Sequence, residues 1–185
     1  MARRLLLAFA VASCALLVSP VGSPADGRPR AAACAGATLR PAADNLPAVR
    51  AALLCLHNRD RAARGLPPLR ENTRLRAAAG AHARDMVLDG YFAHERPDGA
   101  DIATRIRASG YATRRVWALG ENIAWGSGTL ATAAEIHRAW MASPGHRANI
   151  LRRQFRAVGF GVALGVPVDG PADGATYAAD FGSRR

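Results

Sequence analysis

Apolar and polar residues alternate with two different periods along this chain, a helical period first and a strand period last. In the first part, Val49, Leu53 and Leu56 recur at the three- to four-residue spacing that places side chains on one face of a helix. Glycine or proline follows each such segment, as is typical of helix ends. The predicted helices run from Asn45 to Gly65, from Asn72 to Gly90, over Asp101–Ser109 and over Thr129–Met141.

The C-terminal third has the period of a β-strand. Val158, Phe160 and Val162 alternate with glycine and alanine, which predicts a strand with two different faces. We expect further strands over Tyr177–Phe181 and Glu121–Trp125. Helices that come first and strands that come last indicate an α+β fold with a small antiparallel sheet.

The first residues have the features of an export signal. Residues 1–25 contain two arginines, then an apolar stretch over Leu5–Val18 and a small-residue cleavage site. The apolar stretch is shorter than the roughly 20 residues that span a membrane, so we expect no transmembrane segment. We expect residues 26–46 to form an irregular arm and residues 47–185 to form one domain. We therefore predict a secreted protein, with lipid anchoring through Cys14 as the alternative.

Two cysteines remain after removal of the signal, Cys34 in the arm and Cys55 in the first helix. An even number of cysteines in an exported protein favours a disulfide. The bridge would hold the arm against the first helix and close a loop of about 20 residues, which stabilises the fold by roughly 3 kcal/mol. Two free thiols are the alternative.

The net charge of +11 describes a basic protein in which all 25 cationic side chains are arginine. The arginines are scattered, without the stripe or the interleaved aromatic residues of a nucleic-acid groove, so we expect no nucleic-acid partner. The charge is instead compatible with attraction to anionic envelope surfaces.

Three residues far apart in the chain form the candidate functional site. His94 follows the predicted end of the second helix, His146 follows a Ser-Pro-Gly turn, and Glu121 lies among half-buried residues. A buried glutamate requires a histidine or arginine partner, so these groups are expected to converge. Two imidazoles and a carboxylate suit a divalent metal or a proton relay. A hydrogen-bonded network with a structural role is the alternative.

Other polar residues carry weaker indications. Ser143 lies three residues before His146 and precedes a proline, so it is a poor candidate for a nucleophile. His82 falls on the apolar face of its helix and is expected to be a core histidine. His57 and His137 lie beside charged residues, and we expect both to be exposed to solvent.

Five sequence blocks, in order, resemble the bacterial members of the CAP superfamily. This superfamily includes cysteine-rich secretory proteins, antigen 5 and pathogenesis-related proteins, and its shared domain is also called the SCP-like extracellular domain. This resemblance implies a three-layer α-β-α sandwich with a central cleft. The blocks are LHNRDRAARGLPPL (Leu56–Leu69), AHARDMVLDGYFAH (Ala81–His94), GENIAWG (Gly120–Gly126), WMASPGHRANIL (Trp140–Leu151), and VGFGVAL with a closing DFG.

The resemblance also implies roles for individual residues. His94 and His146 match the cleft histidines, and Glu121 matches the acid of the GEN block. Many relatives bind zinc or another divalent ion there. A second cleft glutamate of animal and plant members is replaced by Ser143 in this chain, and Glu135, one turn before the tryptophan, is a candidate substitute.

We interpret the chain as a secreted, monomeric binding module for a lipid or another small molecule of the cell envelope, with a cleft able to hold a divalent metal such as Zn²⁺. The missing second carboxylate argues against an enzyme. The alternative is a metal-dependent hydrolase in which His94 and His146 hold the ion and Glu121 is the general base. A third hypothesis gives the cleft residues a purely structural role.

Overall fold

The computed structural model describes residues 33–111, 116–171 and 173–184. The predicted export signal, Cys14 and the first residues of the predicted arm lie outside the described residues. In the part of the chain that is described, no helix is long and apolar enough to cross a membrane.

Five α-helices, one short 3₁₀ helix and four strands follow one another in the described residues. Local sequence signals explain several helix ends: the Asn72 and Asp101 side chains accept hydrogen bonds from backbone amides at the starts of their helices. Gly90 and Gly110 have positive φ angles beyond the ends of the same helices. The elements are α1 (Leu46–Ala62), β1 (Arg70–Glu71), α2 (Thr73–Leu88), α3 (Ile102–Ala108), β2 (Val116–Ser127), η1 (Gly128–Ala131), α4 (Ala133–Ala142), α5 (Pro144–Leu151), β3 (Ala157–Leu164) and β4 (Gly174–Arg184).

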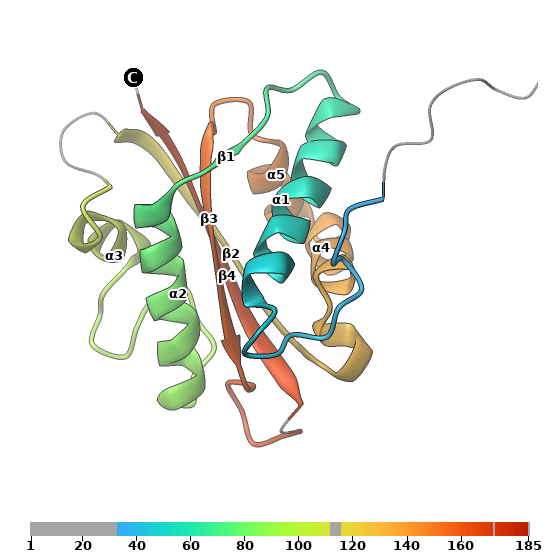
Figure 1. Ribbon diagram of the computed structural model, residues 1–185. Helices are drawn as coiled ribbons and strands as arrows, with labels where there is room; N and C mark the ends of the chain where they lie inside the picture. The colour runs from blue at the N-terminus through green and yellow to red at the C-terminus, as the bar shows by residue number, and fades with distance from the viewer. Residues whose placement is uncertain (1–32, 112–115, 172, 185) are drawn as a thin grey trace, which may run out of the picture. The chain divides into compact units, whose positions relative to one another are not determined.

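The helices cover both faces of the sheet, which confirms the α-β-α sandwich (Figure 1). The helices α1, α4 and α5 pack on one face, where the largest apolar cluster includes Leu53, Trp140 and Phe160. The helices α2 and α3 cover the other face, where α2 packs against Ile123 and Ala178 and Ile106 of α3 packs with Leu75 of α2. The sheet is therefore buried on both sides.

The strand order is β1-β3-β4-β2, so β2 is an edge strand. The pairs β2–β4 and β3–β4 are antiparallel, as the alternating pattern predicted. The short strand β1 was not anticipated: it pairs in parallel with β3, with Arg70 opposite Ala157. Two residues are too few to give a detectable period, so only the pairing itself identifies this strand.

The helix α2 lies directly on the glycines of β3. A Cβ atom on Gly159 would lie 2.0 Å from the backbone nitrogen of Arg76, and one on Gly161 would lie 2.2 Å from the carbonyl carbon of Ala79. No side chain larger than hydrogen fits at these two positions. The alternation of Gly159 and Gly161 with large residues thus lets the helix backbone approach the strand.

The region around Pro144 differs from the prediction. The Pro-Gly pair was expected to end the helix predicted over Thr129–Met141, and α4 does end at Ala142, but a further helix that was not predicted, α5, begins at Pro144. Proline is favoured in the first turn of a helix, because the amide it lacks has no helical partner there. Because α5 begins at Pro144, His146 lies in the first turn of this helix.

The predicted disulfide between Cys34 and Cys55 is present, with a Cα–Cα distance of 5.7 Å. It ties the segment before α1 to the middle of that helix. The same segment also contacts α4, because the amide of Ala134 donates to the carbonyl of Ala37 at 2.8 Å. Residues 33–45 are thus held against both α1 and α4.

Candidate functional site

Glu121 lies at the centre of a buried ionic network on the edge strand β2. Its side chain is 2% exposed. The Nδ1–H group of His94 donates to Oε1 at 2.8 Å, and Nη2 of Arg105 donates to Oε2 at 2.6 Å. Nε2 of His82 lies 3.8 Å from the same Oε2. The expectation that a buried glutamate would have a histidine or arginine partner is confirmed, with one of each.

Arg105 and His82 also hold the loop that carries His94. Nη1 of Arg105 donates to the carbonyls of His94 (2.7 Å) and Ala100 (3.0 Å). Nε2–H of His82 donates to the carbonyl of Ala93 at 3.1 Å, and His82 is fully buried, as predicted. Sequence reasoning missed Arg105. The available signal was its place on the same face of α3 as two isoleucines, where a charged residue is unexpected.

Two buried carboxyl groups face each other across β2 and β4, because Glu121 is paired with Asp180 in the sheet register. Burial acts to raise the pKa of Glu121, but the hydrogen bond from His94 and the charge of Arg105 outweigh it and hold this pKa below its ordinary value. Burial, and then the neighbouring Glu121, raise the pKa of Asp180 well above its ordinary value. The pair therefore favours one ionised and one protonated carboxyl group.

His146 reaches the same strand from the opposite helical layer. Asn122 follows Glu121 and points to the other face of β2, where its Nδ2 donates to the carbonyl of His146 at 3.0 Å. Asn149 Nδ2 in turn donates to the carbonyl of Glu121 (3.0 Å) and to Oδ1 of Asn122 (2.9 Å). Burial, and then the charge of His94, lower the pKa of His146. The two predicted histidines thus flank one edge strand.

His94 is accessible to solvent, since 56% of its side chain is exposed. Its Nδ1 is fixed by Glu121, so Nε2 is the nitrogen available to a ligand. A carboxylate that orients an imidazole in this way is the usual partner of a metal-binding histidine. Within residues 33–111, 116–171 and 173–184, however, no three His, Cys, Asp or Glu side chains are arranged to hold one ion.

The other two predicted cleft residues, Ser143 and Glu135, make their contacts within α5 and α4. Ser143 is the N-cap residue of α5, and its carbonyl accepts a hydrogen bond from the amide of Arg147 at 2.9 Å. Glu135 lies on α4 and forms an ion pair with Arg138. No contact joins Glu135 to Glu121 in the described residues, so Glu135 does not enlarge the set of groups around His94.

The prediction that His57 and His137 are exposed is wrong: they are 0% and 4% exposed. Their helices α1 and α4 pack together, and the two Nδ1 atoms meet at 3.2 Å. The Nδ1–H of His57 donates to the carbonyl of Leu53, and the Nε2–H of His137 donates to Oδ2 of Asp60, each at 2.8 Å. The charged residues Arg59 and Arg138, close to these histidines in the sequence, are exposed, whereas Asp60 turns inward to His137. Burial lowers the pKa of both histidines.

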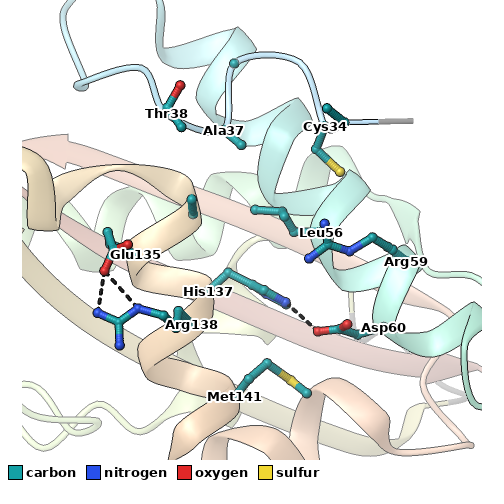
Figure 2. Close-up of a pocket in the computed structure, with 13 residues that line it drawn as sticks. Cys34, Ala37, Thr38, Leu56, Arg59, Asp60, Glu135, His137, Arg138 and Met141 are labelled. Atoms are coloured by element: carbon teal, nitrogen blue, oxygen red, sulfur yellow. Dashed lines mark hydrogen bonds and ion pairs between the residues drawn. The ribbon is translucent and has the colours of Figure 1, made fainter. Parts of the chain in front are cut away.

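A groove of about 580 Å³ opens beside this histidine pair, between residues 33–38, α1 and α4 (Figure 2). Leu56 and Met141 supply apolar walls, and Arg59 supplies a positive charge at the rim. Figure 2 shows the His137–Asp60 and Glu135–Arg138 contacts along the same groove. Its volume lies in the range of small-molecule sites. No sequence motif marked it, because three separate segments form its walls.

Comparison with known proteins finds a match to the model of the cysteine-rich secretory protein family over residues 54–167. The uncharacterized protein YkwD of Bacillus subtilis is 36% identical over 106 residues, which are 57% of this chain and 39% of that protein. This chain therefore spans about two fifths of the length of its curated relative.

Solved structures share the fold at lower identity. An extracellular protein of Bacillus anthracis that contains an SCP domain matches with a TM-score of 0.62 and 24% identity, over 78% of this chain and 44% of that chain. A protein named NaASP2, solved with Zn²⁺, matches with a TM-score of 0.50 and 13% identity, over 74% of this chain and 83% of that chain.

Proposed function

The chain belongs to the cysteine-rich secretory protein family, and we propose that it is a secreted binding module that holds a small amphipathic molecule in the groove between α1 and α4. The export-signal features of residues 1–25 support secretion. So does the extracellular protein of Bacillus anthracis, which has the same fold. The proposal makes binding, and not turnover, the activity of this domain.

The groove is the observation that carries this proposal. Its walls are apolar at Leu56 and Met141, which suits a hydrocarbon body. Among the described residues Arg59 has no ion-pair partner, while Arg138 is already paired with Glu135. A free guanidinium beside an apolar trough matches a ligand with an anionic head and an apolar tail, such as a fatty acid.

Binding of palmitate, measured by isothermal titration calorimetry, tests the proposal. We expect Arg59→Gln to weaken binding about tenfold, since a hydrogen bond to a charged group contributes about 1.5 kcal/mol or more. Arg50→Gln is the matched control, because it removes the same charge from α1 outside the groove lining. If palmitate and lipid extracts do not bind, or both variants bind palmitate equally, the groove is not the ligand site.

A second proposal concerns the exposed imidazole of His94, which a buried carboxylate already orients. We infer that His94 and His146 can bind a divalent transition metal such as Zn²⁺, which would supply a Lewis acid at the protein surface. Zinc should raise the melting temperature of the wild type and not of His94→Ala/His146→Ala. Ser143→Ala should respond like the wild type. Equal stabilisation of the double variant would exclude this pair as the site.

The hydrolase alternative receives less support from the geometry. A general base at Glu121 would have to accept a proton, yet both of its oxygens are engaged and its pKa is held low by its partners. Such a carboxylate orients His94 better than it accepts a proton. An esterase or peptidase activity that falls about a hundredfold in Glu121→Gln, with His94 variants equally inactive, would overturn this view.

A further inference from the structure

Five exposed arginines gather at one end of the sheet, beyond the ends of α1 and α5. They come from two segments that are distant in the chain, residues 64–70 and residues 152–156. This arginine cluster consists of Arg64, Arg70, Arg152, Arg153 and Arg156.

The buried side chain of Arg61 joins these two segments. Its Nε donates to the carbonyl of Pro67 at 2.9 Å. Its Nη1 donates to the carbonyls of Ile150 (2.7 Å) and Arg152 (3.0 Å), and its Nη2 to that of Phe155 (3.1 Å). Because these four bonds span both segments, they hold the surrounding cations in one place.

Strand pairing brings the segments together a second time. The amide of Arg70 donates to the carbonyl of Arg156 at 2.9 Å, and Arg70 lies opposite Ala157 where β1 meets β3. This pairing, together with the hydrogen bonds from Arg61, fixes the two segments relative to one another.

No described carboxylate neutralises the arginine cluster. The nearby Glu71 is paired with Arg76, at 3.1 Å, and the other described ion pairs involve none of the five arginines. The buried Arg61 places a sixth guanidinium beneath the cluster, and burial and then the charge of Arg156 lower its pKa. Like charges held this close repel one another, and an anionic partner would remove that repulsion.

We propose that the arginine cluster docks this domain on an anionic phospholipid surface. Guanidinium groups form paired hydrogen bonds with phosphate oxygens, and several adjacent arginines can contact neighbouring headgroups at once. Phe155, the aromatic residue within the cluster's own segment, is buried, and Arg152 lies over its ring at 5.2 Å. No base-stacking side chain is therefore offered there, which favours a headgroup surface over a nucleic acid. The proposal does not depend on the groove.

Co-sedimentation with vesicles tests this proposal on the folded protein. One set of vesicles contains phosphatidylglycerol and phosphatidylcholine in equal amounts, and the other contains phosphatidylcholine alone. The test variant is Arg70→Gln/Arg153→Gln. In the wild type, the guanidinium groups of these two arginines form no described hydrogen bond. The control variant, Arg84→Gln/Arg107→Gln, removes the same net charge from exposed positions on α2 and α3. Thermal melts establish that both variants are folded.

We expect binding to the anionic vesicles only, weaker at higher salt, and about thirtyfold weaker for the test variant than for the wild type. The control variant should lose only a few-fold. Equal losses in both variants would show that diffuse net charge, and not the arginine cluster, drives adsorption. Absence of binding to anionic vesicles would overturn the proposal. If the test variant binds duplex DNA more weakly than the wild type but binds anionic vesicles equally well, the partner of the arginine cluster is a nucleic acid and not a membrane.

Discussion

Replacement of Arg105 by glutamine removes the shortest contact in the network around Glu121. The two side chains are 6% and 2% exposed and meet at 2.6 Å. The change also removes the bonds from Nη1 to the carbonyls of His94 and Ala100. The variant leaves a buried carboxylate with His94 as its remaining hydrogen-bond donor.

Loss of one partner from a buried ion pair costs about 3–5 kcal/mol, because the other charge remains away from water. We expect the lower end of this range, since His94 still donates to Glu121. For a domain of this size, about 3 kcal/mol lowers the melting temperature by roughly 6–12 °C. The loss should shrink as the pH falls through the ordinary pKa of a glutamate, because protonation of Glu121 removes the unpaired charge.

Thermal denaturation followed by circular dichroism, at neutral and at acidic pH, measures this effect. Arg107→Gln is the control, since Arg107 lies on the same helix and is exposed. If the two variants melt together at neutral pH, Glu121 does not need Arg105. The network would then contribute nothing measurable to the fold.

Two further predictions concern pH and packing in the core. His57 and His137 are buried and have lowered pKa values, so the unfolded chain binds more protons than the folded one. The free energy of unfolding should therefore fall as the pH drops below about 6.5, by up to roughly 1.4 kcal/mol per pH unit for each histidine. Urea unfolding at several pH values measures this slope, and an unchanged slope in His137→Gln would contradict it. Gly161→Ala places a Cβ 2.2 Å from the Ala79 backbone and should cost about 1–3 kcal/mol or more, whereas Gly145→Ala, with open space around it, should stabilise α5 by about 0.5–1 kcal/mol. Equal melting temperatures of these two variants would refute the packing argument.

Local signals predicted most of the elements. The caps at Asn72 and Asp101, the glycine stops and the two-residue period of β3 involve residues only a few positions apart. Such signals are legible in one sequence, because the interactions that produce them are local. The helix α5 was missed for a related reason: a Pro-Gly pair is compatible both with the end of a helix and with the start of one.

The candidate site was predicted in part. The carboxylate of Glu121 had to find a histidine or arginine partner, and His94 and Arg105 both donate to it. Arg105 lies on the helix α3 and Asp180 on the strand β4, both distant from Glu121 in the sequence. The residues next to them in the sequence do not indicate a contact with Glu121. His137 was placed in solvent because the residues beside it are charged, although its helix turns it towards α1.

The sequence by itself determined where most of the helices and strands form, favoured a disulfide between Cys34 and Cys55, and required a partner for a buried glutamate. Tertiary structure decided which faces meet: α2 against Gly161, α4 against α1, and three separate segments around the groove. The reason is physical. Period and capping depend on neighbours in the chain, whereas burial and charge pairing depend on neighbours in space, which exist only after the layers have packed.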